Sequence, residues 1–199
     1  MLSGRSPGAA GFGLIELMVT ITLLSILLAV GVPSMSAWIR NNKIRTVTDS
    51  LQNGLRSAQA EAARRSRQVV FSLTDDAPTS NTYTAKTNGR NWVASTVALL
   101  TSDDSSVFIE SGILRDAGSG VVVTGPKSIC FSSIGRTVIN DAPGPTGAKC
   151  EAAPYTFDVK MSTDSADDRP LRVTVALGGQ VRMCDPKRSL SSSQPDGCP

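Results

Sequence analysis

A long apolar run near the N-terminus is the feature that most constrains this chain. Residues 12–32 are 21 consecutive positions with one charged side chain, that of Glu16. As an α-helix rising about 1.5 Å per residue, the run is long enough to cross the ~30 Å hydrocarbon core of a membrane. A lone carboxylate in hydrocarbon costs about 2.5 to 3.5 kcal/mol on insertion scales. The run therefore predicts a membrane-spanning helix whose glutamate needs a compensating partner.

The segment before this run, MLSGRSPGAAG, differs from an ordinary secretory signal. It carries a single positive charge, and no small-x-small cleavage site leading into a mature domain follows directly after the apolar run. The small residues Ala9, Ala10 and Gly11 lie before the run instead. We therefore expect the apolar segment to be retained in the mature protein.

The absence of histidine and the spacing of the cysteines limit the kinds of catalytic and metal-binding site that this chain can form. Without histidine the chain lacks the commonest general base and the commonest neutral metal ligand. The four cysteines form no CxxC pair, and the N-terminal apolar segment points to export, which favours disulfides over reduced thiols. Four cysteines permit three connectivities, of which we favour the sequence-local pairs Cys130–Cys150 and Cys184–Cys198. In the chain-entropy model each pair would stabilise the fold by about 3 kcal/mol.

A second helical pattern follows the apolar run and differs from it in character. Apolar residues recur at spacings of three and four, which is typical of one buried face of an amphipathic helix: Ile44, Val47, Leu51, Leu55, Ala58 and Ala62. The other face is mainly basic and ends in Arg64, Arg65 and Arg67, where cations suit a helix C-terminus. We predict one long helix from about residue 13 to 66, apolar all round at first and then packed on a globular domain.

From residue 68 the periodicity changes to short strand-like runs separated by turn residues. The clearest unit is LRVTVALGGQVRMC, which predicts a hairpin that turns at Gly178 and Gly179, with residues 171–177 as its first strand. Residues 141–148 predict a loop bracketed by Cys130 and Cys150, and the tail 185–199 lacks periodicity. The candidate strands are 68–73, 81–85, 91–95, 106–111, 120–125, 128–133, 155–162, 171–177 and 180–184. The expected fold is α+β, a long helix lying on antiparallel sheet.

The stretch GFGLIELMVTITLLSILLAVGVP resembles the class III signal of type IV pilins and type II secretion pseudopilins. The resemblance implies that a prepilin peptidase removes residues 1–11 by cutting after Gly11 and methylates the new amino terminus at Phe12. Glu16 becomes the fifth mature residue and Pro33 the twenty-second, both in register with the family, whereas Gly13 replaces the usual threonine. Cleavage exposes an ammonium that Glu16 can approach, on its own helix or on a neighbouring subunit. The resemblance favours the neighbour.

The rest of the chain is similar to the FimT and FimU minor pilins and the related GspH pseudopilin, through AQAEAARRSRQVVFSL and GGQVRMCDP. This resemblance implies the type IV pilin fold: a filament-core half of the helix at 12–33, an amphipathic half at 34–67 and a β-rich head at 68–199. It implies a subunit that primes pilus assembly and forms part of the tip complex. The implied partners are other minor and major pilins, prepilin peptidase, the inner-membrane assembly platform and a tip adhesin.

The implied location is the bacterial inner membrane with the head in the periplasm, and the pilus tip at the cell surface after assembly. The first alternative function is a GspH-like minor pseudopilin of a type II secretion system, since both machines use the same anchor. Chemistry alone does not separate the two.

A second alternative is a FimT-like DNA receptor for natural transformation. Receptors of that kind carry a GRxR-type motif near the C-terminus, and here only Arg182 matches it. Lys187 and Arg188 could add phosphate contacts, but residues 180–199 carry a net charge of only +1, and phosphate binding needs several clustered cations. We rank DNA binding below structural assembly.

The sequence favours no enzymatic reading. No S-x-x-K motif or nucleophile elbow is present. The aspartates at 75–76, 103–104 and 164–168 lack the spacing of a calcium loop. We therefore predict no catalytic residues, no cofactor and no metal site.

Overall fold

The computed structural model describes residues 13–77, 79–80, 82–99, 105–114 and 118–199, but not the side chains of Val30 and Pro33. One helix is followed by nine strands in the described part of the chain. They are α1 (Leu14–Arg65), β1 (Val69–Thr74), β2 (Asn91–Thr96), β3 (Phe108–Ile113), β4 (Val121–Thr124), β5 (Ser128–Phe131), β6 (Tyr155–Met161), β7 (Leu171–Val175), β8 (Val181–Ser189) and β9 (Gly197–Cys198). The chain divides into two compact units at Ile39 and Arg40, and the second is called the head below.

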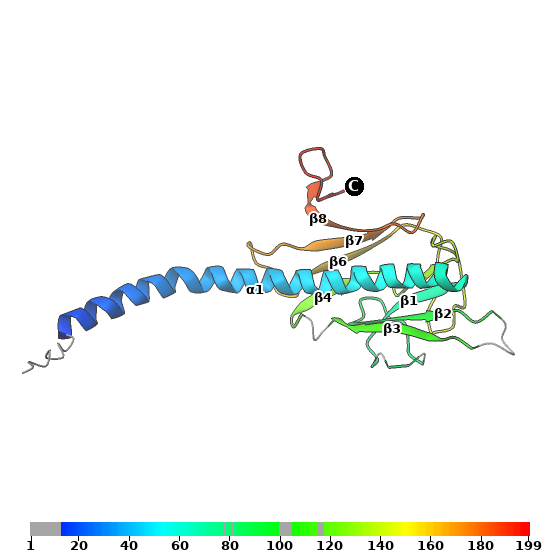
Figure 1. The fold of residues 1–199 in the computed structure, drawn as a ribbon, viewed down its shortest axis with the longest axis horizontal. Helices are drawn as coiled ribbons and strands as arrows, with labels where there is room; N and C mark the ends of the chain where they lie inside the picture. Colours follow the sequence, from blue (N-terminus) through cyan, green and yellow to red (C-terminus); the bar gives the residue numbers. More distant parts are fainter. Residues whose placement is uncertain (1–12, 78, 81, 100–104, 115–117) are drawn as a thin grey trace, which may run out of the picture. The chain divides into compact units, whose positions relative to one another are not determined.

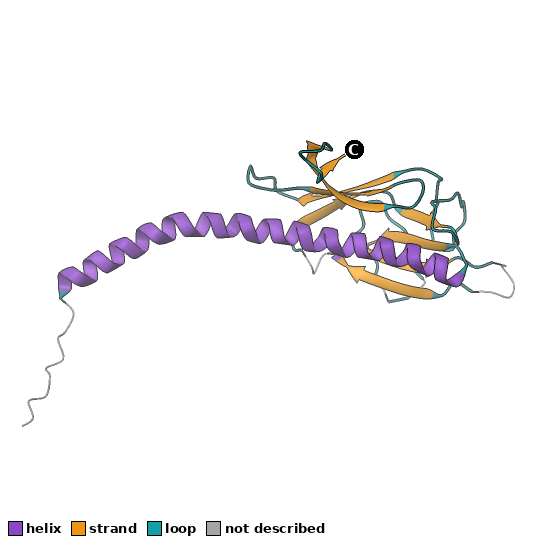
Figure 2. Cartoon of the chain, turned by 45° about the horizontal axis from the view of Figure 1, so that its top comes forward, coloured by secondary structure: helices purple, strands orange, loops and turns teal. Residues whose placement is uncertain are grey.

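The strands of the head form two sheets. One has the order β3-β2-β1-β5 and is antiparallel throughout. The other has the order β4-β6-β7-β8-β9 and is antiparallel except for the short parallel pair of β8 and β9. Within the head, the two sheets lie on either side of the C-terminal part of α1 (Figures 1 and 2). This arrangement is the α+β architecture expected from the sequence.

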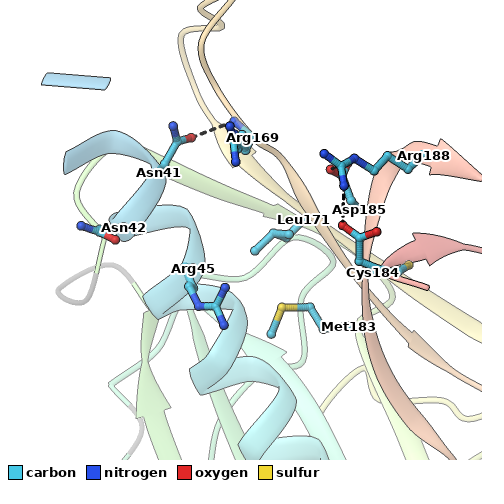
Figure 3. A pocket seen from close by; sticks show the side chains of 10 residues that line it. Asn41, Asn42, Arg45, Arg169, Leu171, Met183, Cys184, Asp185 and Arg188 are labelled. Carbon is cyan, nitrogen blue, oxygen red and sulfur yellow. Dashed lines mark hydrogen bonds and ion pairs between the residues drawn. The ribbon is translucent and has the colours of Figure 1, made fainter. Parts of the chain in front are cut away.

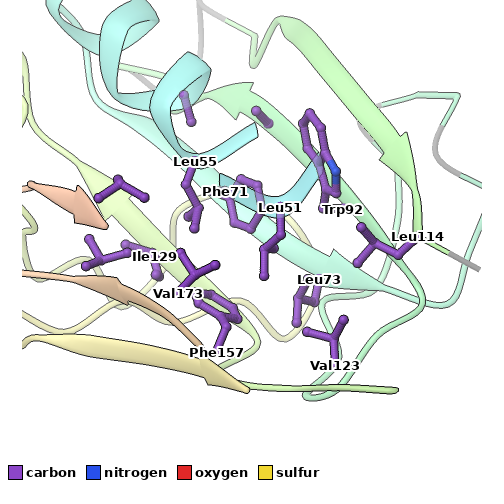
Figure 4. Packing of buried hydrophobic residues seen from close by; sticks show 14 of the residues in the cluster. Leu51, Leu55, Phe71, Leu73, Trp92, Leu114, Val123, Ile129, Phe157 and Val173 are labelled. Atoms are coloured by element: carbon purple, nitrogen blue, oxygen red, sulfur yellow. The ribbon is translucent and has the colours of Figure 1, made fainter. Parts of the chain in front are cut away.

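One apolar cluster joins the helix to both sheets (Figure 4). Phe71 of β1 and Phe157 of β6 pack edge to face with ring centroids 6.4 Å apart. Leu51 and Leu55 of α1 are fully buried, and burying each contributes about 1.5 to 3 kcal/mol. All six helix residues of the predicted apolar face are in the cluster: Ile44, Val47, Leu51, Leu55, Ala58 and Ala62. The spacing of three and four therefore predicts the buried face of the helix correctly.

Trp92 of β2 is enclosed by two glycines that sequence reasoning does not single out. A Cβ at Gly54 of α1 would lie 2.7 Å from the indole ring, and one at Gly112 of β3 only 2.3 Å from its nitrogen. The ring also stacks on Phe71 with centroids 5.4 Å apart. Since side chains cannot approach this closely, the two glycines allow α1 and β3 to close over the ring.

The predicted hairpin is present but its first strand is shorter than expected. β7 ends at Val175 instead of residue 177, because Ala176 begins the turn, and its amide donates to the Gln180 carbonyl at 3.0 Å. Leu177 is consequently 42% exposed. Gly179 has a φ of +88°, and a Cβ there would overlap the Gly135 carbonyl oxygen at 1.7 Å. Glycine is required at this position for both reasons.

Two other expectations about strands are wrong. Residues 82–85 form only isolated bridges, Thr84 with Thr146 and Ala85 with Thr74, and Asn81 lies outside the described residues. Their hydrogen bonds go to two separate segments, so no continuous ladder forms. The tail is more regular than expected, because β8 extends to Ser189 and β9 pairs with it.

The two disulfides join Cys130 to Cys150 and Cys184 to Cys198, which are the sequence-local pairs. Cys130 and Cys150 are fully buried and form a small second cluster with Val70. The other bridge holds the tail against β8, where the Asp185 amide donates to the Asp196 carbonyl at 2.8 Å. A cross-link thus explains ordered strand structure in a segment without apolar periodicity.

The helix ends in a Schellman-type motif. The Arg67 amide donates to the Ala62 carbonyl at 3.1 Å and the Ser66 amide to the Ala63 carbonyl at 3.2 Å. Ser66 adopts the left-handed conformation that the motif requires, with a φ of +49°. The helix therefore ends at Arg65, close to the predicted end.

The positive charge at the C-terminal end of α1 is partly neutralised by a glutamate of the same helix. Glu61 accepts hydrogen bonds from Arg64 and Arg65, each at 2.7 Å. The Arg64 hydrogen bond, followed by that of Arg65, lowers the pKa of Glu61 from 4.5 to about 2. Arg67 reaches the Val97 carbonyl at 2.9 Å. These contacts support a structural role for the basic end.

Replacing Gly54 with Ala tests the packing of the helix on Trp92. An exposed glycine in a helix would gain about 1 kcal/mol from this change, but here we expect a loss of about 1 to 3 kcal/mol from overpacking. Thermal or urea unfolding of the full chain in detergent measures the difference. In a Trp92→Leu background the loss should shrink, because the clashing ring is gone. An equal loss in both backgrounds would contradict the packing argument.

Replacing both Arg64 and Arg65 with Gln should return the pKa of Glu61 toward 4.5, as followed by the carboxyl-carbon NMR shift. Because the folded-state pKa is depressed, Glu61 contributes stability above about pH 4.5 that is lost as the pH falls toward 2. Arg136→Gln, at an exposed position in the head, should leave the titration unchanged. Titration of Glu61 near 4.5 in the unaltered chain would rule the pairing out.

Candidate assembly segment and head surface

The first unit exposes an unusually large apolar surface. Large apolar residues from Leu14 to Leu28 are each at least 50% exposed, and they occupy every face of the helix. Exposed apolar surface of this extent marks a membrane or protein contact. By length and composition, α1 is the one helix in the described residues that could cross a membrane.

The hydroxyl groups within this apolar segment are satisfied by the helix itself. Thr20 donates to the Leu17 carbonyl at 2.8 Å, Thr22 to the Val19 carbonyl at 2.9 Å, and Ser25 to the Ile21 carbonyl at 2.7 Å. Such local bonding lets a hydroxyl sit in an apolar environment without an external partner. These three residues are therefore compatible with a membrane or a filament core.

Glu16 is the exception in this segment. It lies in the first turn of α1, is exposed, and has no hydrogen bond or ion pair within the part of the chain that the structure describes. A position in the first turn favours a carboxylate through the helix dipole, but by only about 0.3 to 1 kcal/mol. This is less than the cost of placing it in hydrocarbon. The Glu16 carboxylate therefore still needs a compensating partner.

The structure describes little of the other three residues for which the sequence predicts a role in this segment. Gly11 and Phe12, at the expected processing site, lie outside the described residues. The backbone of Pro33 lies within α1. The expected roles of these three residues stay predictions.

The three cations of the DNA hypothesis lie on β8 but are held by neighbouring groups. Arg182 donates to the Pro195 carbonyl at 2.9 Å and Lys187 to the Asp168 carbonyl at 2.8 Å. Arg188 binds the Asp196 carboxylate at 2.8 Å. These contacts organise the tail and the adjacent loop, and they do not favour an open phosphate-binding cluster.

The loop at 162–170 is fixed to the first turns of α1 in the head. Arg40 binds Asp168 through two nitrogens, at 2.8 and 2.5 Å. This hydrogen bonding lowers the pKa of Asp168 and raises that of Arg40. The Asn41 amide donates to the Asp167 carbonyl at 3.0 Å, and its oxygen accepts from the Arg169 amide at 2.8 Å. The acidic loop is thus occupied in intramolecular contacts.

The other acidic positions show a similar pattern. Asp75 pairs with Lys86 and with Arg90, and Asp103 and Asp104 lie outside the described residues. Within the described ranges, no group of three or more acidic or cysteine side chains is arranged to hold a metal ion.

Comparisons with known proteins identify the family. The model of the prokaryotic N-terminal methylation motif matches residues 7–32, and that of the type II transport protein GspH matches residues 47–179. No curated protein sequence matches the chain.

Two solved structures similar to this chain are minor components of related machines. The type IV minor pilin FimU of Pseudomonas aeruginosa is 14% identical with a TM-score of 0.49, over 79% of this chain and 96% of that one. The minor pseudopilin EpsH from the Type 2 Secretion System of Vibrio cholerae is 14% identical with a TM-score of 0.47, over 74% and 99%. Because the GspH model covers well over half of its length, the chain belongs to the GspH family, with the N-terminal methylation motif of pilin-like proteins.

Proposed function

We propose that the protein is a minor type IV pilin that primes pilus assembly and becomes part of the tip complex. The observation that carries the proposal is that Glu16 is the one charged side chain of the apolar run at 12–32, whose large apolar side chains from Leu14 to Leu28 are exposed. Such a helix is suited to two environments in turn, the membrane and the core of a helical filament. Glu16 supplies the specific contact that distinguishes the second from the first.

The compensating charge is the amino terminus created by processing. Prepilin peptidase cuts after Gly11 and methylates the amine of Phe12. Four residues of helix rise about 6 Å, so Glu16 lies close enough for an amine to be placed beside it. In the low-dielectric filament core an unpaired carboxylate is costly, whereas a paired one fixes the axial position of the incoming subunit. The amine of a neighbouring subunit is the partner that this account favours.

This mechanism implies where the protein lies and which proteins it contacts. Before assembly, the helix anchors the protein in the bacterial inner membrane and the head lies in the periplasm. The assembly platform then moves the subunit into a filament of major and other minor pilins, with a tip adhesin. The head contributes a packed, disulfide-bonded surface, and the protein has no enzymatic role.

A second candidate function is a minor pseudopilin of a type II secretion system. The description of the matching family, a type II transport protein, favours it. Both functions use the same anchor and the same Glu16 contact. Deleting the gene separates them, because loss of surface filaments with normal protein secretion supports the pilus, and the reverse supports the secretion system.

Replacing Glu16 with Ala should abolish incorporation into filaments while the protein still inserts in the membrane and folds. Immunoblots of sheared filaments and of membranes measure the two populations. Glu151→Ala, an exposed glutamate in the head, is the matched control and should incorporate normally. Normal incorporation of the Glu16 variant would contradict the proposed docking contact.

Replacing Gly11 with Ala should leave an uncut precursor that remains in the membrane and does not assemble. The retained segment of 11 residues makes the chain visibly larger on a gel. Replacing the neighbouring Ala10 with Gly should leave processing intact. A Gly11 variant of mature size would place the cut elsewhere.

A further inference from the structure

The head contains a cavity of about 360 Å³ between α1 and the strands β7 and β8 of the second sheet (Figure 3). It is lined by one turn of the helix, the end of the loop at 162–170, the start of β7, the middle of β8 and the tail: Asn41, Asn42, Arg45, Arg169, Leu171, Met183, Cys184, Asp185, Arg188 and Asp196. Its volume lies within the range of small-ligand pockets. None of the functions discussed above uses the cavity as a whole, and of its lining only Arg188 belongs to the DNA hypothesis.

Two cations in this cavity are at most weakly paired within the described residues. The Arg169 guanidinium has no hydrogen bond or ion pair among the described residues. Arg45 has a single ion pair, with Asp49 at 3.8 Å, and its side chain is 69% exposed. An exposed pair of that length is worth little. Both guanidinium groups are therefore available to an anion.

The third arginine of the lining is already engaged. Arg188 lies 2.8 Å from Asp196 and 3.6 Å from Asp185, so that cluster carries a net charge of −1. The whole lining has three positive and two negative side chains, which leaves +1. The cavity thus has a cationic part, at Arg45 and Arg169, and a weakly anionic part.

Apolar side chains lie beside the free cations. Figure 3 shows Arg45 reaching from the helix toward Met183, with Leu171 next to both. Cys184, which is disulfide-bonded to Cys198, completes this apolar surface. A ligand for this cavity would therefore combine a carboxylate with an apolar group.

The cationic part is held in place before any ligand arrives. Asn41 fixes the backbone of Asp167 and Arg169, and Arg40 fixes Asp168 between them. Arg45 is carried by the helix, one turn beyond Asn41. Binding would thus order only the two arginine side chains, which limits its entropic cost.

We propose that this cavity binds an acidic peptide segment, in which separate carboxylates meet Arg45 and Arg169 and an apolar side chain between them contacts Leu171 and Met183. Each guanidinium group suits a carboxylate through charge-assisted hydrogen bonds. A nucleic acid fits less well, because its phosphates carry no apolar side chain that could contact Leu171 and Met183. The source of the segment is an adjacent subunit of the same filament, a step that rests on the proposed function.

The test uses the full chain in detergent and a labelled, end-capped peptide of alternating glutamate and leucine. Fluorescence anisotropy should show binding that weakens with salt. The double variant Arg45→Gln/Arg169→Gln should bind about tenfold or more weakly, the loss expected for charge-assisted bonds. Arg136→Gln removes one positive charge from an exposed site outside the cavity and should bind normally. Unchanged thermal melting confirms that the variants fold.

Several outcomes would overturn the proposal. They are no binding of the peptide, equal binding of a glutamine-for-glutamate peptide, equal affinity of the double variant, and displacement of the peptide by a DNA oligonucleotide or by inorganic phosphate at comparable concentration. None of these measurements requires a filament. A failure here therefore leaves the proposed role in assembly to its own test, and a Glu16 variant that assembles normally leaves the peptide site intact.

Discussion

The head depends on the apolar face of α1 between Ile44 and Ala62. This face contributes six buried side chains to one cluster that reaches both sheets, so the helix is the element that the two sheets share. A sheet with one apolar face must pack against another element, and here the helix supplies buried side chains to the inner faces of both sheets. The close approach at Trp92, with glycine on both sides, shows how tightly the helix is fitted. The helix that exposes the long apolar segment is in this way also the core element of the head.

Local patterns predict the parts of the fold whose residues are close in sequence. The spacing of Ile44, Val47 and Leu51 gives the buried helix face, and the GlyGly pair gives the hairpin turn. The ends of these elements are less accurate, since β7 stops at Val175 when Ala176 enters the turn. Residues 82–85 have strand-like composition, but their hydrogen-bonding partners lie on two distant segments. Pairing of this kind is decided by tertiary contacts and not by local propensity.

The candidate sites likewise differ in whether local sequence or tertiary structure reveals them. Glu16 is recognisable from sequence because one charge in a long apolar run is costly wherever it lies. The cavity at Arg45 and Arg169 is not, because its lining comes from a helix, a loop, two strands and a tail that are far apart in the chain. The basic residues of β8 illustrate the converse. Arg182, Lys187 and Arg188 lie near one another in the sequence, but each is held by a carbonyl or carboxylate in the folded head.

Mass spectrometry of sheared, purified filaments tests the central claim most directly. The account predicts that this chain is present in them at low abundance and that its first peptide begins at N-methylated Phe12, with residues 1–11 absent. Recovery of the chain only from membranes, with residues 1–11 still attached, would contradict it.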